Sequence, residues 1–176
     1  DLRGVIVTGM FKDSGYGAKV SDPLCGFDFD LGCISTINEC CYSAYPVCPP
    51  ALTDGTIGIA VDLWLEDTTA ARAKYGDIML WDTSRVTSLA NLFAKRYRFN
   101  EDISRWNTER VTSMAATFTA ARSFTVSLAR WNVANVMSLR STWCSAWEYE
   151  GKELGSWNIT SNLVDMEHIA FDARKF

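Results

Sequence analysis

The chain has 176 residues, of which 48% are hydrophobic and 22% charged, as in an ordinary soluble globular protein. Its formal net charge of −4 and its isoelectric point near 5.0 provide none of the basic surface that nucleic-acid binding needs, so we expect no nucleic-acid partner. No run approaches the roughly 18 apolar residues of a membrane-spanning helix, so any membrane contact is expected to be peripheral and to go through partners.

The first segment, residues 1–50, ends at a Pro-Pro pair and lacks helical periodicity. Five of the six cysteines lie in it, and such clustering is typical of disulfide-bonded segments in oxidising compartments. We therefore predict an irregular arm held by disulfides. Because five is an odd number, one cysteine is free to reach the distant sixth; the candidates are Cys25, Cys33, Cys40, Cys41, Cys48 and Cys144. Their spacings lack the close pairs of a zinc site, and we predict no metal.

A helical cap is predicted over residues 51–74. Apolar residues recur there at the spacing of one helical face, with Thr53 or Asp54 available as the N-cap; they are Ile57, Ala60, Val61, Trp64 and Leu65. A second short helix is predicted over residues 68–74. The end of a repeat stack exposes apolar surface, and this helical segment is suited to cover it.

Residues 75–176 contain an internal repeat of four units. Trp81, Trp106, Trp131 and Trp157 are 25, 25 and 26 residues apart, and other apolar positions recur in phase with them. Large aromatic residues at a repeat period are core residues first. The predicted repeat core consists of these tryptophans together with Val86, Val111, Val136, Phe93, Phe118 and Trp143.

Each unit combines two kinds of local pattern. Met114 and Phe118 stand four residues apart, which predicts a short helical turn facing inward, whereas the segment after each tryptophan is aromatic and reads as extended. The Asp or Asn that follows each tryptophan can shape a turn. The sequence therefore predicts an α/β repeat solenoid of the leucine-rich-repeat type, with four coils of about 25 residues, an N-terminal helical cap and the disulfide-bonded arm.

The repeat resembles a known family. WDTSRVTSL (residues 81–89) and FNEDISRWNTERVTSM (residues 99–114) are similar to the BspA-like leucine-rich repeat of mycoplasma and lactobacillus surface proteins. The lead-in from residue 52 resembles versions found in eukaryotic microalgae. The resemblance covers residues 52–176 and implies a secreted or cell-surface protein that is used for adhesion or protein contact, with no catalytic residues. The third and fourth units depart from the pattern, for example at Ala170, where phenylalanine is expected.

Candidate catalytic groups are sparse. The single histidine, His168, occupies a repeat position without apolar character, and no serine or cysteine partner can be argued for it. The acidic pairs Asp28/Asp30 and Glu66/Asp67 fit solvated surface better than the opposed carboxylates of a hydrolase. Asn158 lies in a glycosylation sequon but also in a turn position of the repeat. We predict that the chain is not an enzyme and binds no cofactor.

Trp147 is the predicted contact residue, because its approximate counterparts in earlier units, Arg122 and Arg96, carry charge. The leading hypothesis is a non-catalytic protein–protein interaction or scaffolding module, which docks onto a larger assembly or surface through its arm and a solenoid face. One alternative is a peripheral lumen-side subunit of a large membrane complex, for instance a photosynthetic one. The other is a carbohydrate-binding surface adhesin domain with Trp147 in its platform. The expected location is extracellular, at the cell surface, or in an oxidising lumen, thylakoid or secretory.

Overall fold

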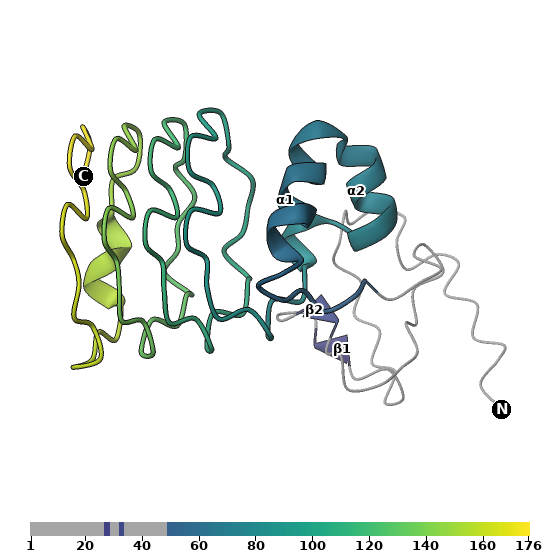
Figure 1. Ribbon diagram of the computed structural model, residues 1–176, viewed down its shortest axis with the longest axis horizontal. Coiled ribbons are helices and arrows are strands. Elements are labelled where there is room, and N and C mark those ends of the chain that lie inside the picture. The colour runs from purple at the N-terminus through teal and green to yellow at the C-terminus, as the bar shows by residue number, and fades with distance from the viewer. Residues whose placement is uncertain (1–26, 29–31, 34–48) are drawn as a thin grey trace, which may run out of the picture.

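The computed structural model describes residues 27–28, 32–33 and 49–176. Strands β1 (Phe27–Asp28) and β2 (Gly32–Cys33) pair antiparallel. Helices α1 (Ile57–Glu66) and α2 (Thr68–Tyr75) follow and pack against each other. The rest of the chain winds through four coils, which contain the short 3-10 helices η1 (Ile78–Leu80) and η2 (Lys152–Ser156). Figure 1 shows the two α-helices beside the first coil and the C-terminus in the last one.

The two α-helices lie where the sequence predicts helices, but the first begins later than expected. Its N-cap is Thr56, without a side-chain cap, and neither Thr53 nor Asp54 fills that position. Helix α2 is capped by the Asp67 carboxylate, which accepts a hydrogen bond from the Ala70 N–H at 2.9 Å. The apolar face of α1 is buried, and this face consists of Ile57, Ala60, Val61 and Trp64.

Asp54 is engaged at the start of the coil stack. Its carboxylate accepts hydrogen bonds from the Thr87 N–H at 2.7 Å, the Thr87 hydroxyl at 2.6 Å and the Ser88 N–H at 3.0 Å. In the following coils the amide equivalent to that of Thr87 donates to the preceding coil, as the Thr112 N–H does to the Thr87 carbonyl. Asp54 thus supplies the acceptor that a preceding coil would otherwise provide.

We predict that Asp54→Ala lowers the free energy of unfolding by about 1–2 kcal/mol at neutral pH, as the loss of a helix-type cap does. The hydrogen bond from the Thr87 hydroxyl, helped by the two backbone amides, holds the pKa of Asp54 below its ordinary value of 3.8. A depressed folded-state pKa contributes stability that is present above pH 3.8 and is lost as pH falls through the folded pKa. Urea titrations of both chains should therefore differ at neutral pH and converge in strong acid; a difference that persists there contradicts this role.

The coils themselves contradict the predicted α/β leucine-rich-repeat solenoid. In the described coil residues there is neither an α-helix nor a β-strand, and both described α-helices precede them. Successive coils meet at isolated parallel bridges, which pair Ser88 with Ser113, Ser113 with Ser138, and Ser138 with Asp165. Backbone hydrogen bonds between adjacent coils take the place of regular secondary structure.

The helical turn predicted from the four-residue spacing of Met114 and Phe118 is wrong, for a physical reason. Between Met114 and Ala121, N–H groups donate alternately to the carbonyl three residues back and to the next coil. Ala116 and Ala120 adopt a left-handed backbone, with φ of 56° and 58°, so the chain makes successive turns and not a helix. Such turns also return the chain to the same face every four residues. Apolar spacing alone cannot distinguish the two structures.

The left-handed positions give a test of this backbone. A left-handed conformation costs an L-residue about 1–2 kcal/mol, and glycine avoids that cost but loses more entropy on folding. We therefore expect Ala116→Gly to raise the free energy of unfolding by up to about 1 kcal/mol, whereas Ala115→Gly, at the neighbouring half-buried position without positive φ, should lower it by about 1 kcal/mol. Urea denaturation measures both, and the same sign for the two variants would contradict the described backbone.

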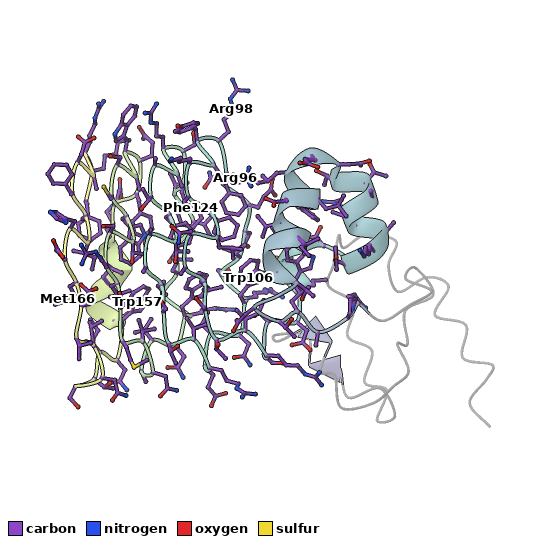
Figure 2. All side chains as sticks on the ribbon, viewed as in Figure 1. Arg96, Arg98, Trp106, Phe124, Trp157 and Met166 are labelled. Atoms are coloured by element: carbon purple, nitrogen blue, oxygen red, sulfur yellow. The ribbon has the colours of Figure 1, made fainter. Side chains whose placement is uncertain are left out.

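The core runs through the stack as columns of aromatic rings. Trp81, Trp106, Trp131 and Trp157 are buried, and each of the last three donates its indole N–H to a carbonyl of the preceding coil. The Trp106 indole, for example, lies 2.8 Å from the Ile78 carbonyl oxygen. Other buried positions are Val86, Val111, Val136, Phe93, Phe118 and Trp143. Figure 2 labels Trp106 and Trp157, whose side chains lie within the stack of coils.

The disulfide-bonded arm has no support from the structure. Cys144, the predicted distant partner, is a free, half-buried thiol. Cys33 ends strand β2, and the predictions on Cys25, Cys40, Cys41 and Cys48 fall outside the described residues. An odd number of cysteines in the first segment does not by itself imply a disulfide bond to Cys144, because a disulfide forms only where the fold brings two sulfur atoms together.

Candidate interaction surfaces

Among the described residues, the groups that were weighed as catalytic candidates lie on different elements. His168 is exposed on the last coil, where its imidazole Nδ1 lies 3.4 Å from the Glu167 carboxylate and its ring contacts Phe171 edge-on. Asp67 caps helix α2, and Asp30 lies outside the described residues. Among the residues that the structure describes, no group of three or more His, Cys, Asp or Glu side chains is placed to hold a metal ion, and no helix is long and apolar enough to cross a membrane.

The fourth coil leaves a row of backbone donors open. In the first three coils, alternate amides donate to carbonyls of the next coil, as the Phe118 N–H does to the Thr142 carbonyl at 2.9 Å. The equivalent donors of the second and third coils are the amides of Met114, Ala116, Phe118, Ala120, Leu139, Ser141, Trp143 and Ser145. In the fourth coil, the equivalent amides have no acceptor among the described residues; they belong to Met166, His168, Ala170 and Asp172. We call this surface the open end.

Apolar side chains accompany these donors. Met166 stands in the column of Leu139, yet 54% of its surface is exposed while Leu139 is 2% exposed. Phe176 stands in the column of Tyr149 and is 46% exposed, compared with 1% for Tyr149. The difference arises because each earlier coil is covered by the next one. The open end therefore presents unpaired amides together with uncovered core positions, and Figure 2 shows Met166 at that extremity.

A second surface runs along one ridge of the stack, where equivalent positions alternate aromatic and arginine. Tyr97, Arg122, Trp147 and Arg174 lie in successive coils, and each guanidinium lies over a ring. The distances from guanidinium carbon to ring centroid are 4.7 Å for Arg122 over Tyr97, and 3.9 Å for both Arg122 and Arg174 over Trp147. We call these four residues the arginine ladder.

The arginine ladder changes the interpretation of Trp147. The sequence marked it as an isolated aromatic among charged counterparts, with Arg96 as the earliest of them. The residue 25 positions before Arg122 is however Tyr97, so Trp147 belongs to an alternating series, whose last spacing is 27 residues. Its ring is flanked by guanidinium groups from the preceding and following coils, and its indole N–H donates to Asp172 at 3.3 Å. A half-buried ring with this stacking does not present a free face on which a sugar could stack.

A shallow groove crosses the coils on another side. It is lined by Thr87, Glu109, Arg110, Thr112, Asn135, Met137 and Asn162. Two of its amide side chains are used within the stack, since Asn135 donates to the Glu109 carbonyl at 2.8 Å and Asn162 to the Ala134 carbonyl at 3.1 Å. The groove therefore contributes to coil-to-coil cohesion, and nothing in its lining selects a ligand.

Comparison with known proteins gives one family. Residues 65–176 match the family described as "Mycoplasma protein of unknown function, DUF285". No curated protein matches the chain, and no solved structure does. The matched residues include all four coils, the open end and the arginine ladder.

Proposed function

This chain belongs to the DUF285 family of mycoplasma proteins, and from that premise we propose that it is a non-catalytic protein-interaction module whose open end binds a further polypeptide segment. The observation that carries the proposal is the row of unpaired amides on Met166, His168, Ala170 and Asp172 beside uncovered apolar side chains. Buried or interfacial backbone donors need acceptors, and main-chain addition to an open edge satisfies them.

The chain itself indicates what the partner segment must offer. Three times in the stack, a row of alternate amides is met by carbonyl oxygens of a neighbouring coil, with apolar side chains covering the core columns. A partner segment of the same kind would supply alternate carbonyls to the four open amides and apolar side chains to Met166 and Phe176. Affinity would then come from the backbone, and selectivity from the side chains that it places on the open columns.

A second copy of the chain is a poor occupant. The opposite end of the stack is covered by α1 and by Asp54, which already satisfies the Thr87 and Ser88 amides. Two open ends facing each other would bring one row of N–H donors against another, with no acceptor within either row. The occupant therefore comes from a different surface, one rich in free carbonyls.

We place this interaction at the cell surface. The support is the likeness of residues 81–89 and 99–114 to BspA-like repeats of mycoplasma and lactobacillus surface proteins. Surface modules of repeated coils commonly act through protein contact.

The test uses a synthetic peptide that carries the third-coil sequence, residues 125–150, with Cys144→Ser to prevent oxidation. Biolayer interferometry measures its binding to the whole chain. Met166→Glu should weaken binding at least tenfold, because a carboxylate would be placed on the uncovered apolar column. The matched control is Ile59→Glu, an equally exposed apolar residue on α1, which should bind as the unaltered chain does.

Amide hydrogen exchange on the same samples locates the contact. Binding should slow exchange at Met166, His168, Ala170 and Asp172. Peptide binding that is indifferent to Met166→Glu, or a mixture in which these four amides gain no protection, would contradict the proposal.

A further inference from the structure

We propose that the arginine ladder is a binding site for an acidic polypeptide segment in extended conformation, with carboxylates on alternate residues. The site uses Arg122 and Arg174 as its two anchors, and Tyr97 and Trp147 as the rings that hold them. The ladder meets the open end at the fourth coil, where Asp172 holds Trp147, but the two proposals use different groups and different probes, so either can fail without the other.

The stacking fixes both guanidinium planes. Arg122 lies between the rings of Tyr97 and Trp147, and Arg174 covers the Trp147 ring from the following coil. The Trp147 ring is itself held by its hydrogen bond to Asp172. A stacked guanidinium has lost much of its rotational freedom before any ligand arrives, so less entropy is lost on binding.

The donors of both anchors are available. Three other arginines of the described residues, Arg72, Arg96 and Arg140, are paired with carboxylates. Neither the Arg122 guanidinium nor the Arg174 guanidinium has an ion pair or hydrogen bond among the described residues, and both residues are exposed. A guanidinium presents several N–H donors in its plane, which suits two parallel hydrogen bonds to one carboxylate. Stacking uses the face of the group and leaves these edges free.

The spacing of the anchors favours alternate residues of an extended chain. Each guanidinium carbon lies 3.9 Å from the same ring centroid, so the two carbons are at most about 8 Å apart. Side chains on one face of an extended strand repeat every two residues, which is roughly 7 Å. Carboxylates at alternate positions can therefore reach Arg122 and Arg174 together, whereas adjacent carboxylates point to opposite faces.

Charges around the ladder favour a peptide over a uniform polyanion such as polyphosphate. Asp172 lies beside Trp147, and Glu148 forms an ion pair with Lys175. A uniform polyanion would be attracted by the arginines but repelled by these carboxylates. It would also be repelled by the chain as a whole, whose net charge is −4. A peptide that alternates acidic and neutral residues can direct its carboxylates to the two arginines alone.

The experiment measures fluorescence anisotropy of labelled peptides with the whole chain at low and physiological salt. The probe is a ten-residue peptide of alternating glutamate and threonine, and its isomer with the glutamates in one block is the matched control. We expect the alternating peptide to bind at least fivefold more tightly than the isomer, with affinity that falls as salt increases.

The diagnostic variant is Arg122→Lys combined with Arg174→Lys, which keeps both charges but removes the planar fork and the stacking. It should weaken binding of the alternating peptide about tenfold, while Arg110→Lys, outside the ladder, leaves it unchanged. Melting temperatures of all chains exclude unfolding as the cause. Equal binding by the double variant, equal binding of the two isomers, no binding of the alternating peptide at low salt, or tighter binding of polyphosphate than of peptide would each overturn the proposal.

Discussion

Trp106→Ala should lower the free energy of unfolding by about 4 kcal/mol, one of the two largest effects expected from a single substitution in the stack. The side chain is 3% exposed, stacks on Trp81 at 5.9 Å between ring centroids, and packs against Phe93. Its indole N–H also links two coils through the Ile78 carbonyl. The substitution removes a large buried ring and an inter-coil hydrogen bond together, and the cavity lies where neighbouring coils cannot collapse independently.

Urea denaturation followed by circular dichroism measures this loss. Trp147→Ala is the matched control, because it removes the same side chain from a half-buried position on the ridge. We expect that control to cost about 1 kcal/mol, the scale of its cation–π contacts. Similar losses for the two variants would show that Trp106 is not a core residue that joins coils.

Phe118→Ala is expected to cost about 3–5 kcal/mol, for a different structural reason. Phe118 is fully buried at the crossing of two ring columns, with Phe124 at 4.3 Å within its coil and Phe93 at 5.5 Å in the preceding one. Removing it interrupts both the column along the stack and the pair within the coil.

The control for Phe118 is Phe171→Ala in the fourth coil. Phe171 is 63% exposed, so its truncation should change the free energy of unfolding by less than about 1 kcal/mol. Thermal unfolding of the two variants gives the comparison. A larger loss at Phe171 than at Phe118 would mean that the fourth coil is covered as fully as the second.

The repeat and its buried residues could be read from the sequence, but the backbone of the coils could not. A 25-residue recurrence of tryptophan identifies which positions are equivalent, and equivalent large apolar residues are buried together whatever backbone carries them. The local conformation depended on Ala116 and Ala120, whose left-handed backbone is not a preference of alanine. Hydrogen bonds to the neighbouring coil hold the backbone in that conformation. A short stretch of sequence does not reveal these bonds, because their acceptors lie in another coil.

The candidate surfaces were only partly within reach of the sequence. Trp147 was identified as unusual, but its meaning depended on Arg174, which lies beyond the regular spacing because the fourth coil has extra residues. The open end was not predicted, because it consists of backbone amides that every residue type carries. Asp54 was predicted as a helix cap, yet it bonds to Thr87, which is 33 residues away. From the sequence alone, an acidic residue such as Asp54 can be either a helix N-cap or an acceptor for the amides of a coil. Only the position of the first coil decides between the two roles.

Inter-coil backbone hydrogen bonds hold the stack together, and the fourth-coil donors have no acceptor among the described residues. Residue-resolved amide hydrogen exchange of the free chain tests this arrangement most directly. We predict slow exchange at the inter-coil donors of the second and third coils, such as Phe118 and Trp143, and fast exchange at their fourth-coil equivalents, His168, Ala170 and Asp172. Equal protection of all these amides, or fast exchange at Phe118 and Trp143, would contradict the account.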